Sequence, residues 1–242
     1  SDVYKRQEKM SLNAGLSFQP QKSDLSYKKG ELDTMTVRNV FNFTPTFDFR
    51  YKFSKTSQLR IRYRGKAAQP DMVDLLPISD NTDPLNIQNG NPGLKPTFTN
   101  ELRAEYNFFN TENQRGMFSF FRYQNVLNDI SNRRVYDPQT GGYVTTPENI
   151  NGNWNLMGMV GTNIALRNKK YTINTFTRAN YQNMISYISD KNVVADTDKN
   201  TTKRLSLGER LRGTYRNDWG EFSLNGSLDY THSRNSYQES NN

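Results

Sequence analysis

Polar and apolar residues alternate one by one along much of this chain, most regularly between residues 41 and 53. The stretch reads FNFTPTFDFRYKF, with an aromatic ring or proline at every odd position and a polar or charged side chain at every even position. Successive side chains of a β-strand point to opposite faces of the sheet. The pattern therefore predicts a strand with Phe43 and Phe47 on an apolar face and Asp48 on a polar one.

The same alternation recurs in nine segments, which we predict to be strands. They cover about 9–20, 37–53, 57–65, 97–109, 116–130, 154–166, 171–188, 202–215 and 221–232. Short turns and long polar loops alternate between them, with the long loops at about 21–36, 66–96, 131–152 and 189–201. This order predicts an all-β, antiparallel up-and-down sheet with short turns at one end and long loops at the other. Transmembrane β-barrels have this pattern, with periplasmic turns and extracellular loops.

The apolar face has two possible neighbours, lipid or a protein core. The strands are about twice as long as the usual 5–6 residues of soluble proteins, which favours lipid over a soluble β-sandwich with one buried face. Aromatic side chains also flank the short turns, as at a membrane interface. These are Tyr51, Phe53, Phe108, Phe109, Phe118, Tyr171, Tyr215 and Trp219. We expect the polar face to line a water-filled lumen. Glu209, in phase with Leu205 and Leu207, is an exception that requires either a β-bulge or a different register.

Composition narrows the class of protein. Only 33% of residues are hydrophobic but 12% are aromatic, and the mean hydropathy is −0.91. This balance suits a sheet with one wet face better than a globule with a thick core. No apolar run approaches the 18–20 residues that a membrane helix needs, and the first 30 residues contain no signal-peptide core. A helical membrane protein is thus excluded.

Candidate chemistry is sparse. The chain has no cysteine, which excludes disulfides, thiolate metal sites and cysteine nucleophiles. Its net charge of +8 is spread without a basic run, so we expect no nucleic-acid partner. The single histidine, His232, has no partner cluster and is interpreted as a solvated strand-end residue. With no carboxylate pair and no phosphate-binding loop, we expect no enzyme activity, cofactor or resident metal.

Two loop segments carry a resemblance to a known family. They read PDMVDLLPISDNTDPLNIQNGNPGLKPTFTNELRAEYNFF from Pro70 and DPQTGGYVTTPENINGNW from Asp137. Residues 8–242 resemble the outer-membrane β-barrel region of Bacteroidetes TonB-dependent receptors, in which a run like Gly90–Pro96 precedes a long strand. Thr97 departs from the pattern, because an acidic residue is common there.

The resemblance implies location in the cell outer membrane and active import of a scarce nutrient, which can be a glycan, a peptide, cobalamin or an iron chelate. It implies four partners: outer-membrane lipid, the receptor's own plug domain, the TonB complex and possibly a SusD-like lipoprotein. Two alternatives stay open, a passive porin or structural barrel and a surface adhesin. Receptors of this family have about 22 strands, an even number as in other bacterial single-chain barrels. We therefore expect residues 8–242 to be a partial barrel domain, without the plug.

Three local features complete the expectations. Residues 1–7, SDVYKRQ, look like a translated transposon end from a sequencing library, an artefact. Asp71, Asp74, Asp80 and Asp83 could supply oxygen ligands to Ca²⁺, but their spacing matches no known calcium loop, and we interpret them as turn formers.

Arginines on the polar face are the candidate substrate-binding residues, because a basic lumen would concentrate anionic solutes. The best candidates are Arg60, Arg62, Arg64 and Arg103, and the wider set adds Arg122, Arg178, Arg210 and Arg212. The alternative role for these arginines is ion pairing with Glu101, Glu105 and Asp229, or with the plug.

Overall fold

The computed structural model describes residues 9–29, 32–166, 169–188 and 199–237, and the predicted artefact at residues 1–7 lies outside them. Thirteen strands lie in this part of the chain. They are β1 (Met10–Lys29), β2 (Leu32–Ser54), β3 (Ser57–Ala68), β4 (Ser79–Asp80), β5 (Asn86–Asn89), β6 (Thr97–Asn110), β7 (Arg115–Leu127), β8 (Asp129–Asp137), β9 (Gly142–Ile150), β10 (Asn153–Leu166), β11 (Tyr171–Tyr187), β12 (Lys199–Asn217) and β13 (Gly220–Asn235). None of the described residues belongs to a helix that is long and apolar enough to cross a membrane.

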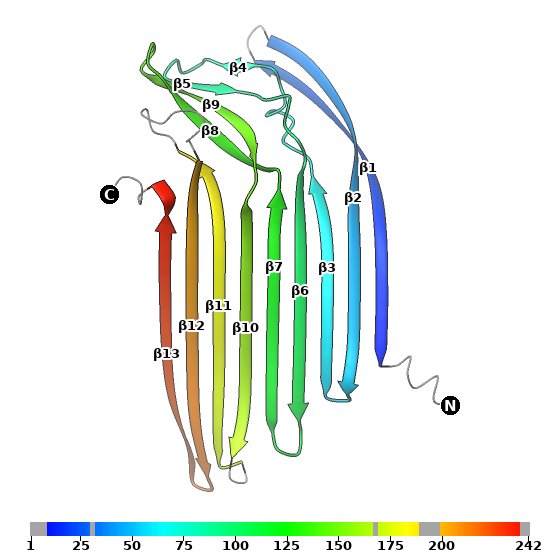
Figure 1. Cartoon of the computed structure of the whole chain (residues 1–242), viewed down its shortest axis with the longest axis vertical. Coiled ribbons are helices and arrows are strands. Elements are labelled where there is room, and N and C mark those ends of the chain that lie inside the picture. The colour runs from blue at the N-terminus through cyan, green and yellow to red at the C-terminus, as the bar shows by residue number, and fades with distance from the viewer. Residues whose placement is uncertain (1–8, 30–31, 167–168, 189–198, 238–242) are drawn as a thin grey trace.

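Nine long strands form one sheet in the order β1-β2-β3-β6-β7-β10-β11-β12-β13 (Figure 1). All neighbours in it are antiparallel, and each predicted strand corresponds to one of the nine. The predicted up-and-down arrangement is therefore confirmed. In the described part of the chain β1 and β13 are edge strands, so the sheet is open rather than closed into a barrel.

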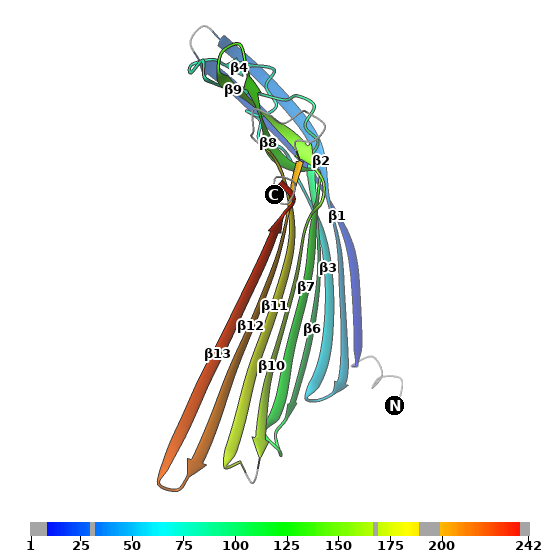
Figure 2. The same ribbon diagram turned by 60° about the vertical axis from the view of Figure 1, so that its left-hand side comes forward.

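The predicted long loops are only partly loops. Residues 21–36 were expected to be a loop, but they extend β1 and β2, which pair as far as Lys29 and Leu32. The loops at 66–96 and 131–152 supply a second sheet, in the order β4-β5-β9-β8. Figure 2 shows this sheet at the end opposite the short turns. These strands are polar and short, and β5 pairs with β9 in parallel from 57 residues away (Asn86 with Tyr143), so local alternation could not reveal them. The last predicted loop, 189–201, is described only from Lys199, where β12 begins.

The register of the nine-stranded sheet fixes two faces. Phe49 lies opposite Leu12 on β1 and Ile61 on β3, and the same matching of apolar positions continues across the sheet. Aromatic pairs mark both ends of the apolar face. Tyr171 and Tyr215 have ring centroids 5.0 Å apart near the short turns, and Trp154 and Tyr181 have centroids 5.2 Å apart near the other end. Tyr171 and Tyr181 are about 33 Å apart along β11 at 3.3 Å per residue. A usual strand tilt reduces this to about the 25 Å height of a barrel's apolar band.

Glu209 does not sit at a bulge, and the register is not shifted there. It pairs with Thr177 on β11 and Leu228 on β13 within uninterrupted ladders, so it projects from the apolar face. The Thr177 hydroxyl donates a hydrogen bond to its carboxylate. The prediction of a bulge or a different register is thus wrong. A polar neighbour on the next strand satisfies the carboxylate without disturbing the backbone.

Gly65 makes room for an aromatic pair on the apolar face. The rings of Phe43 and Phe98 stack with centroids 5.0 Å apart. A Cβ added at Gly65 would lie 2.6 Å from the Phe98 ring and 2.8 Å from Cγ of Pro45.

We predict that Gly65→Ala lowers the free energy of unfolding by about 1–3 kcal/mol, the usual cost of overpacking. Gly213→Ala is the matched control, since a Cβ there meets nothing within 4 Å on the same face. It should change stability by less than about 0.5 kcal/mol. Urea unfolding in lipid vesicles measures both variants, and equal effects would contradict this account of Gly65.

Candidate functional site

The candidate arginines meet on the polar face because the strand register aligns them. Arg62 on β3, Arg103 on β6 and Arg122 on β7 lie directly opposite one another across three adjacent strands. We call these three residues the arginine rung. Asp48 on β2 continues the rung beyond Arg62. Like charges directly opposite one another in a sheet repel, so the arrangement requires compensation from elsewhere.

Acidic side chains compensate part of the rung diagonally. Arg62 forms an ion pair with Glu105, which lies one step closer to the short turns. Arg103 pairs with Glu101, one step closer to the outer sheet, with 2.8 Å between Nε and Oε1. The Arg103 Nε–H group does not point along this line, so the contact is an ion pair without a hydrogen bond.

Asp48 is held by Arg60. The Arg60 Nη2 donates to Oδ2 at 2.6 Å and Nε donates to Oδ1 at 3.1 Å, a bidentate contact. Arg50 approaches the same carboxylate from the other side at 3.5 Å. All four predicted binding residues, Arg60, Arg62, Arg64 and Arg103, therefore lie on the polar face, and three of them hold acidic partners. The predicted alternative of ion pairing applies to these three.

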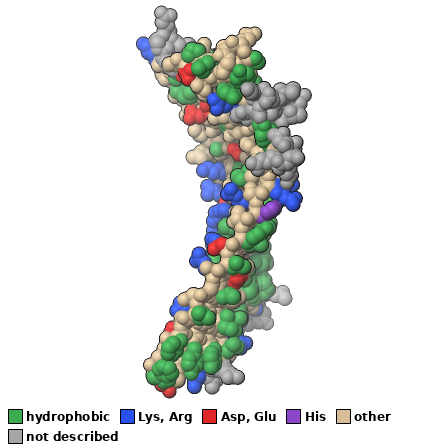
Figure 3. Space-filling view, turned by 90° about the vertical axis from the view of Figure 1, so that its left-hand side faces the viewer, with side chains coloured by type: hydrophobic (Ala, Val, Ile, Leu, Met, Phe, Trp, Pro, Cys, Tyr) green, Lys and Arg blue, Asp and Glu red, His purple; other side chains and the backbone are tan. Residues whose placement is uncertain are grey.

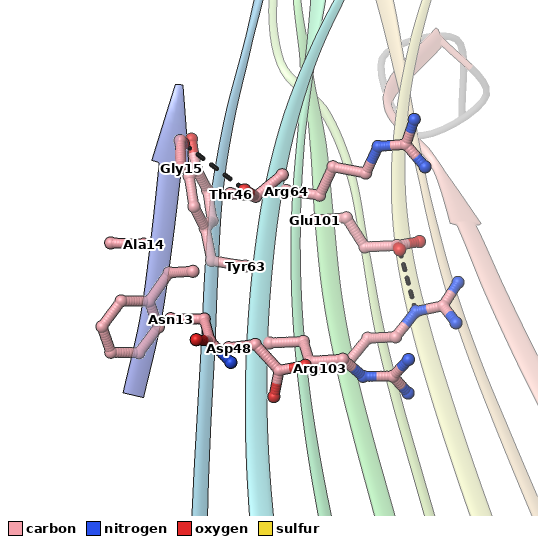
Figure 4. A pocket seen from close by; sticks show the side chains of 11 residues that line it. Asn13, Ala14, Gly15, Thr46, Asp48, Tyr63, Arg64, Glu101 and Arg103 are labelled. Atoms are coloured by element: carbon pink, nitrogen blue, oxygen red, sulfur yellow. Dashed lines mark hydrogen bonds and ion pairs between the residues drawn. The ribbon is translucent and has the colours of Figure 1, made fainter. Parts of the chain in front are cut away.

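Arg64 and Arg122 differ from the other arginines of this region, since neither forms an ion pair with the described residues. The Nε atom of Arg122 is buried and accepts no partner in the described structure. Arg64 is exposed and lines a depression of about 470 Å³ together with Arg62, Arg103 and Glu101. Figure 4 shows Arg64, Glu101 and Arg103 projecting to one side of the sheet and Ala14 to the other. Cationic groups with free donors at the wall of a depression can bind a carboxylate, sulfate or phosphate.

Apolar side chains adjoin the arginine rung on the same face, which the sequence analysis missed. They are Phe118, Phe120, Met157, Met159 and Phe176. Phe118 was expected at the lipid interface, but it lies opposite Asn107 and Gly161, on the polar face. The signal was present in the sequence MFSFF, since Phe118 and Phe120 have the opposite parity to Phe121. This surface could contact the apolar part of a solute.

The remaining polar-face arginines lie farther along the sheet, towards β13. Arg178 forms an ion pair with Asp229 at 2.7 Å, as the pairing alternative predicted. Arg212 donates to the Ser223 hydroxyl at 3.2 Å, and Arg210 lines a neighbouring depression with it. The space-filling view in Figure 3 shows Lys and Arg side chains gathered along one side of the molecule and hydrophobic side chains along the other. They extend the basic character of this face beyond the arginine rung.

His232 lies near the outer end of β13, as predicted, but on the apolar face. It pairs with Leu205 and its ring lies parallel to that of Tyr230, with centroids 6.5 Å apart. It is exposed and has no acidic or metal-binding neighbour cluster among the described residues.

The family-like segment Gly90–Pro96 ties the outer sheet together. The side-chain amide of Asn91 donates to the Pro147 carbonyl, while the Lys95 N–H donates to Oδ1 of Asn149. Asn149 in turn donates to the carbonyls of Lys95 and Asn128. The segment thus fastens the 66–96 connection to the β8–β9 hairpin.

The aspartates of the same loop serve local turns. Oδ1 atoms of Asp71, Asp80 and Asp83 accept the backbone N–H groups two residues later. The Asn86 amide and the Leu85 N–H hold the pKa of Asp83 below its usual range, whereas burial raises the pKa of Asp74. No group of three potential metal ligands forms within the described residues. The turn-forming interpretation accounts for these contacts.

Comparison with known proteins gives one result. A family model described as outer membrane protein beta-barrel family matches residues 2–242. Neither a curated protein nor a solved structure matches the chain.

The first prediction separates compensated from uncompensated charge in the arginine rung. Asp48→Asn should lower the free energy of unfolding by about 1–2 kcal/mol, because Arg60 loses a charge-assisted bidentate partner. Arg122→Gln should leave stability unchanged or raise it, since it removes an unpaired charge beside Arg103. Urea unfolding in vesicles distinguishes the two variants, and a larger loss for Arg122→Gln would contradict this assignment.

The second prediction concerns the Asn149 contacts. Asn149→Ala removes three hydrogen bonds and should destabilise the outer sheet locally by about 1–3 kcal/mol. Amide hydrogen exchange should accelerate in residues 86–95 and 142–150 and stay unchanged in β6 and β7. Asn132→Ala, an exposed change in the same hairpin, is the control. Unchanged exchange around Lys95 would contradict the role given to Asn149.

Proposed function

Because the chain belongs to the outer membrane protein beta-barrel family, we propose that it forms part of a TonB-dependent receptor that imports an anionic nutrient across the cell outer membrane. The observation that carries this proposal is the arginine rung, with Arg122 unpaired at its end and Arg64 beside it.

The resemblance supports the active form of transport. The run Gly90–Pro96 occurs in front of a long strand in TonB-dependent receptors, and here it precedes β6. Its contacts to the β8–β9 hairpin hold an ordered sheet at the outer end, opposite the short turns. Ordered outer segments are suited to capturing a scarce solute before it enters the lumen.

Charge and shape support an anionic cargo. Unpaired arginines on a wall with low-dielectric neighbours attract anions more strongly than the same charges in bulk water. Phe120 and Met157 flank Arg122 on the adjoining positions of the polar face. A solute with a carboxylate or phosphate group and an apolar portion would contact both kinds of surface.

Two arms of one uptake experiment test the proposal. Cells that produce the protein receive labelled anionic and neutral oligosaccharides of equal length, with and without a protonophore. We expect uptake of the anionic oligosaccharide to stop when the inner-membrane proton gradient collapses, since TonB transmits that energy. Uptake that survives collapse would instead identify a passive porin.

The second arm tests the arginines. Arg64→Gln/Arg122→Gln should reduce anionic uptake about tenfold, in line with electrostatic focusing, and spare neutral uptake. Lys55→Gln/Lys170→Gln removes the same charge from the short turns and should have little effect. Equal losses of both oligosaccharides in the arginine variant would remove the case for an anionic cargo.

A further inference from the structure

A basic pair on the lipid-facing side of the sheet belongs to neither the lumen nor the outer sheet. Lys203 on β12 and Arg234 on β13 lie directly opposite one another, in phase with Leu205, Leu207 and Tyr230. Both side chains are exposed. Their parity places them on the face that contacts lipid, where cations are otherwise rare because hydrocarbon excludes them.

Their height explains how charges are tolerated there. The pair lies one step beyond Leu205 and His232 and two steps beyond Leu207 and Tyr230, towards the outer end. In the same row lies Trp154, whose ring contacts Tyr123 and Tyr181 with centroids 6.2 and 5.2 Å away. An aromatic cluster of this kind marks the level of the lipid headgroups. Figure 3 shows Lys and Arg side chains next to the histidine, above a band of hydrophobic side chains.

The basic pair is not neutralised by nearby acids of the sheet. In the described parts of β10–β13, Glu209 is the only acidic residue on this face, and it lies six residues from Lys203. Lys203 forms no ion pair with the described residues, and Lys199 adds a further exposed cation on the same face. Directly opposed like charges destabilise a sheet unless an anion lies between them.

The lysines at the other edge of the sheet show the contrast. Lys22 and Lys28 occupy the same face of β1, also near the outer end, and each has an acidic partner. Lys22 pairs with Asp24 at 3.6 Å and Lys28 with Asp33 at 3.8 Å. Neutralisation within the protein is therefore local to β1 and β2, which leaves the β12–β13 pair to an external anion.

We propose that Lys203 and Arg234 bind the phosphate of a phosphorylated lipid headgroup in the outer leaflet. Arginine offers a planar fork of donors that matches two phosphate oxygens, and lysine adds a mobile point charge. The Asn183 amide, opposite Lys203 on β11, supplies a further donor at the same level. Acyl chains would then lie along the apolar side chains below the pair.

The test uses the purified protein in phosphatidylcholine vesicles with and without lipid A, a phosphorylated glycolipid. Lipid retained per protein is measured by native mass spectrometry. Lys203→Gln/Arg234→Gln should bind lipid A about thirtyfold more weakly, the product of roughly fivefold for each basic side chain. Lys22→Gln/Lys28→Gln removes equal charge from the same face and should bind like the wild type.

Three controls make the outcome decisive. Equal unfolding midpoints in pure phosphatidylcholine establish that the variants fold, and the single change Lys203→Gln, with about fivefold weaker binding expected, replaces the double variant if it does not. Equal weakening in both double variants would overturn the site in favour of general surface charge. Displacement of lipid A by inorganic phosphate would overturn the lipid headgroup as its ligand.

Discussion

Uninterrupted register across nine antiparallel strands is the constraint on which the other features depend. Side chains alternate with a period of two, so a slip of one residue would exchange the apolar and polar faces of a strand. In the described pairings of the large sheet, the single irregularity lies between Lys52 and Ser54, at a short turn, where it disturbs no face. The aromatic belts, the arginine rung and the basic pair at β12–β13 all follow from this alignment.

The strands and their faces could be predicted because lipid imposes a rule that acts on every residue singly. Phe49 and Ile61 must be apolar whatever their neighbours are, so the alternation of each strand is visible without knowing its partner. The polar face of Arg60, Arg62, Arg64 and Arg103 followed from the same parity. The outer sheet obeys no such rule. Its strands β5 and β9 meet in parallel across a long stretch of chain, and water solvates both faces of their polar residues.

The arginine rung could not be predicted, because its members come from three strands whose relative register is not written in any one of them. Sequence identified each arginine as polar-facing but not that Arg62, Arg103 and Arg122 would be directly opposed. Nor could it assign acidic partners, since Glu105 and Glu101 reach the rung diagonally from neighbouring positions. The unpaired state of Arg122 is thus a property of the assembled sheet. The same holds for Phe118, whose parity is readable locally but whose place beside the arginines is not.

Charges on the lipid-facing side are distributed unevenly, and this asymmetry indicates where the sheet meets polar surroundings. From β3 to β11 the described apolar face carries no charged side chain. On β1 and β2 its lysines are neutralised by adjacent aspartates. On β12 and β13, Glu209 relies on the Thr177 hydroxyl, and Lys203 faces Arg234. A carboxylate within the band and a basic pair above it have opposite requirements. The first needs a donor in a region without water, and the second needs an anion at the headgroups. The protein supplies the donor, and the membrane surface is the nearest source of the anion.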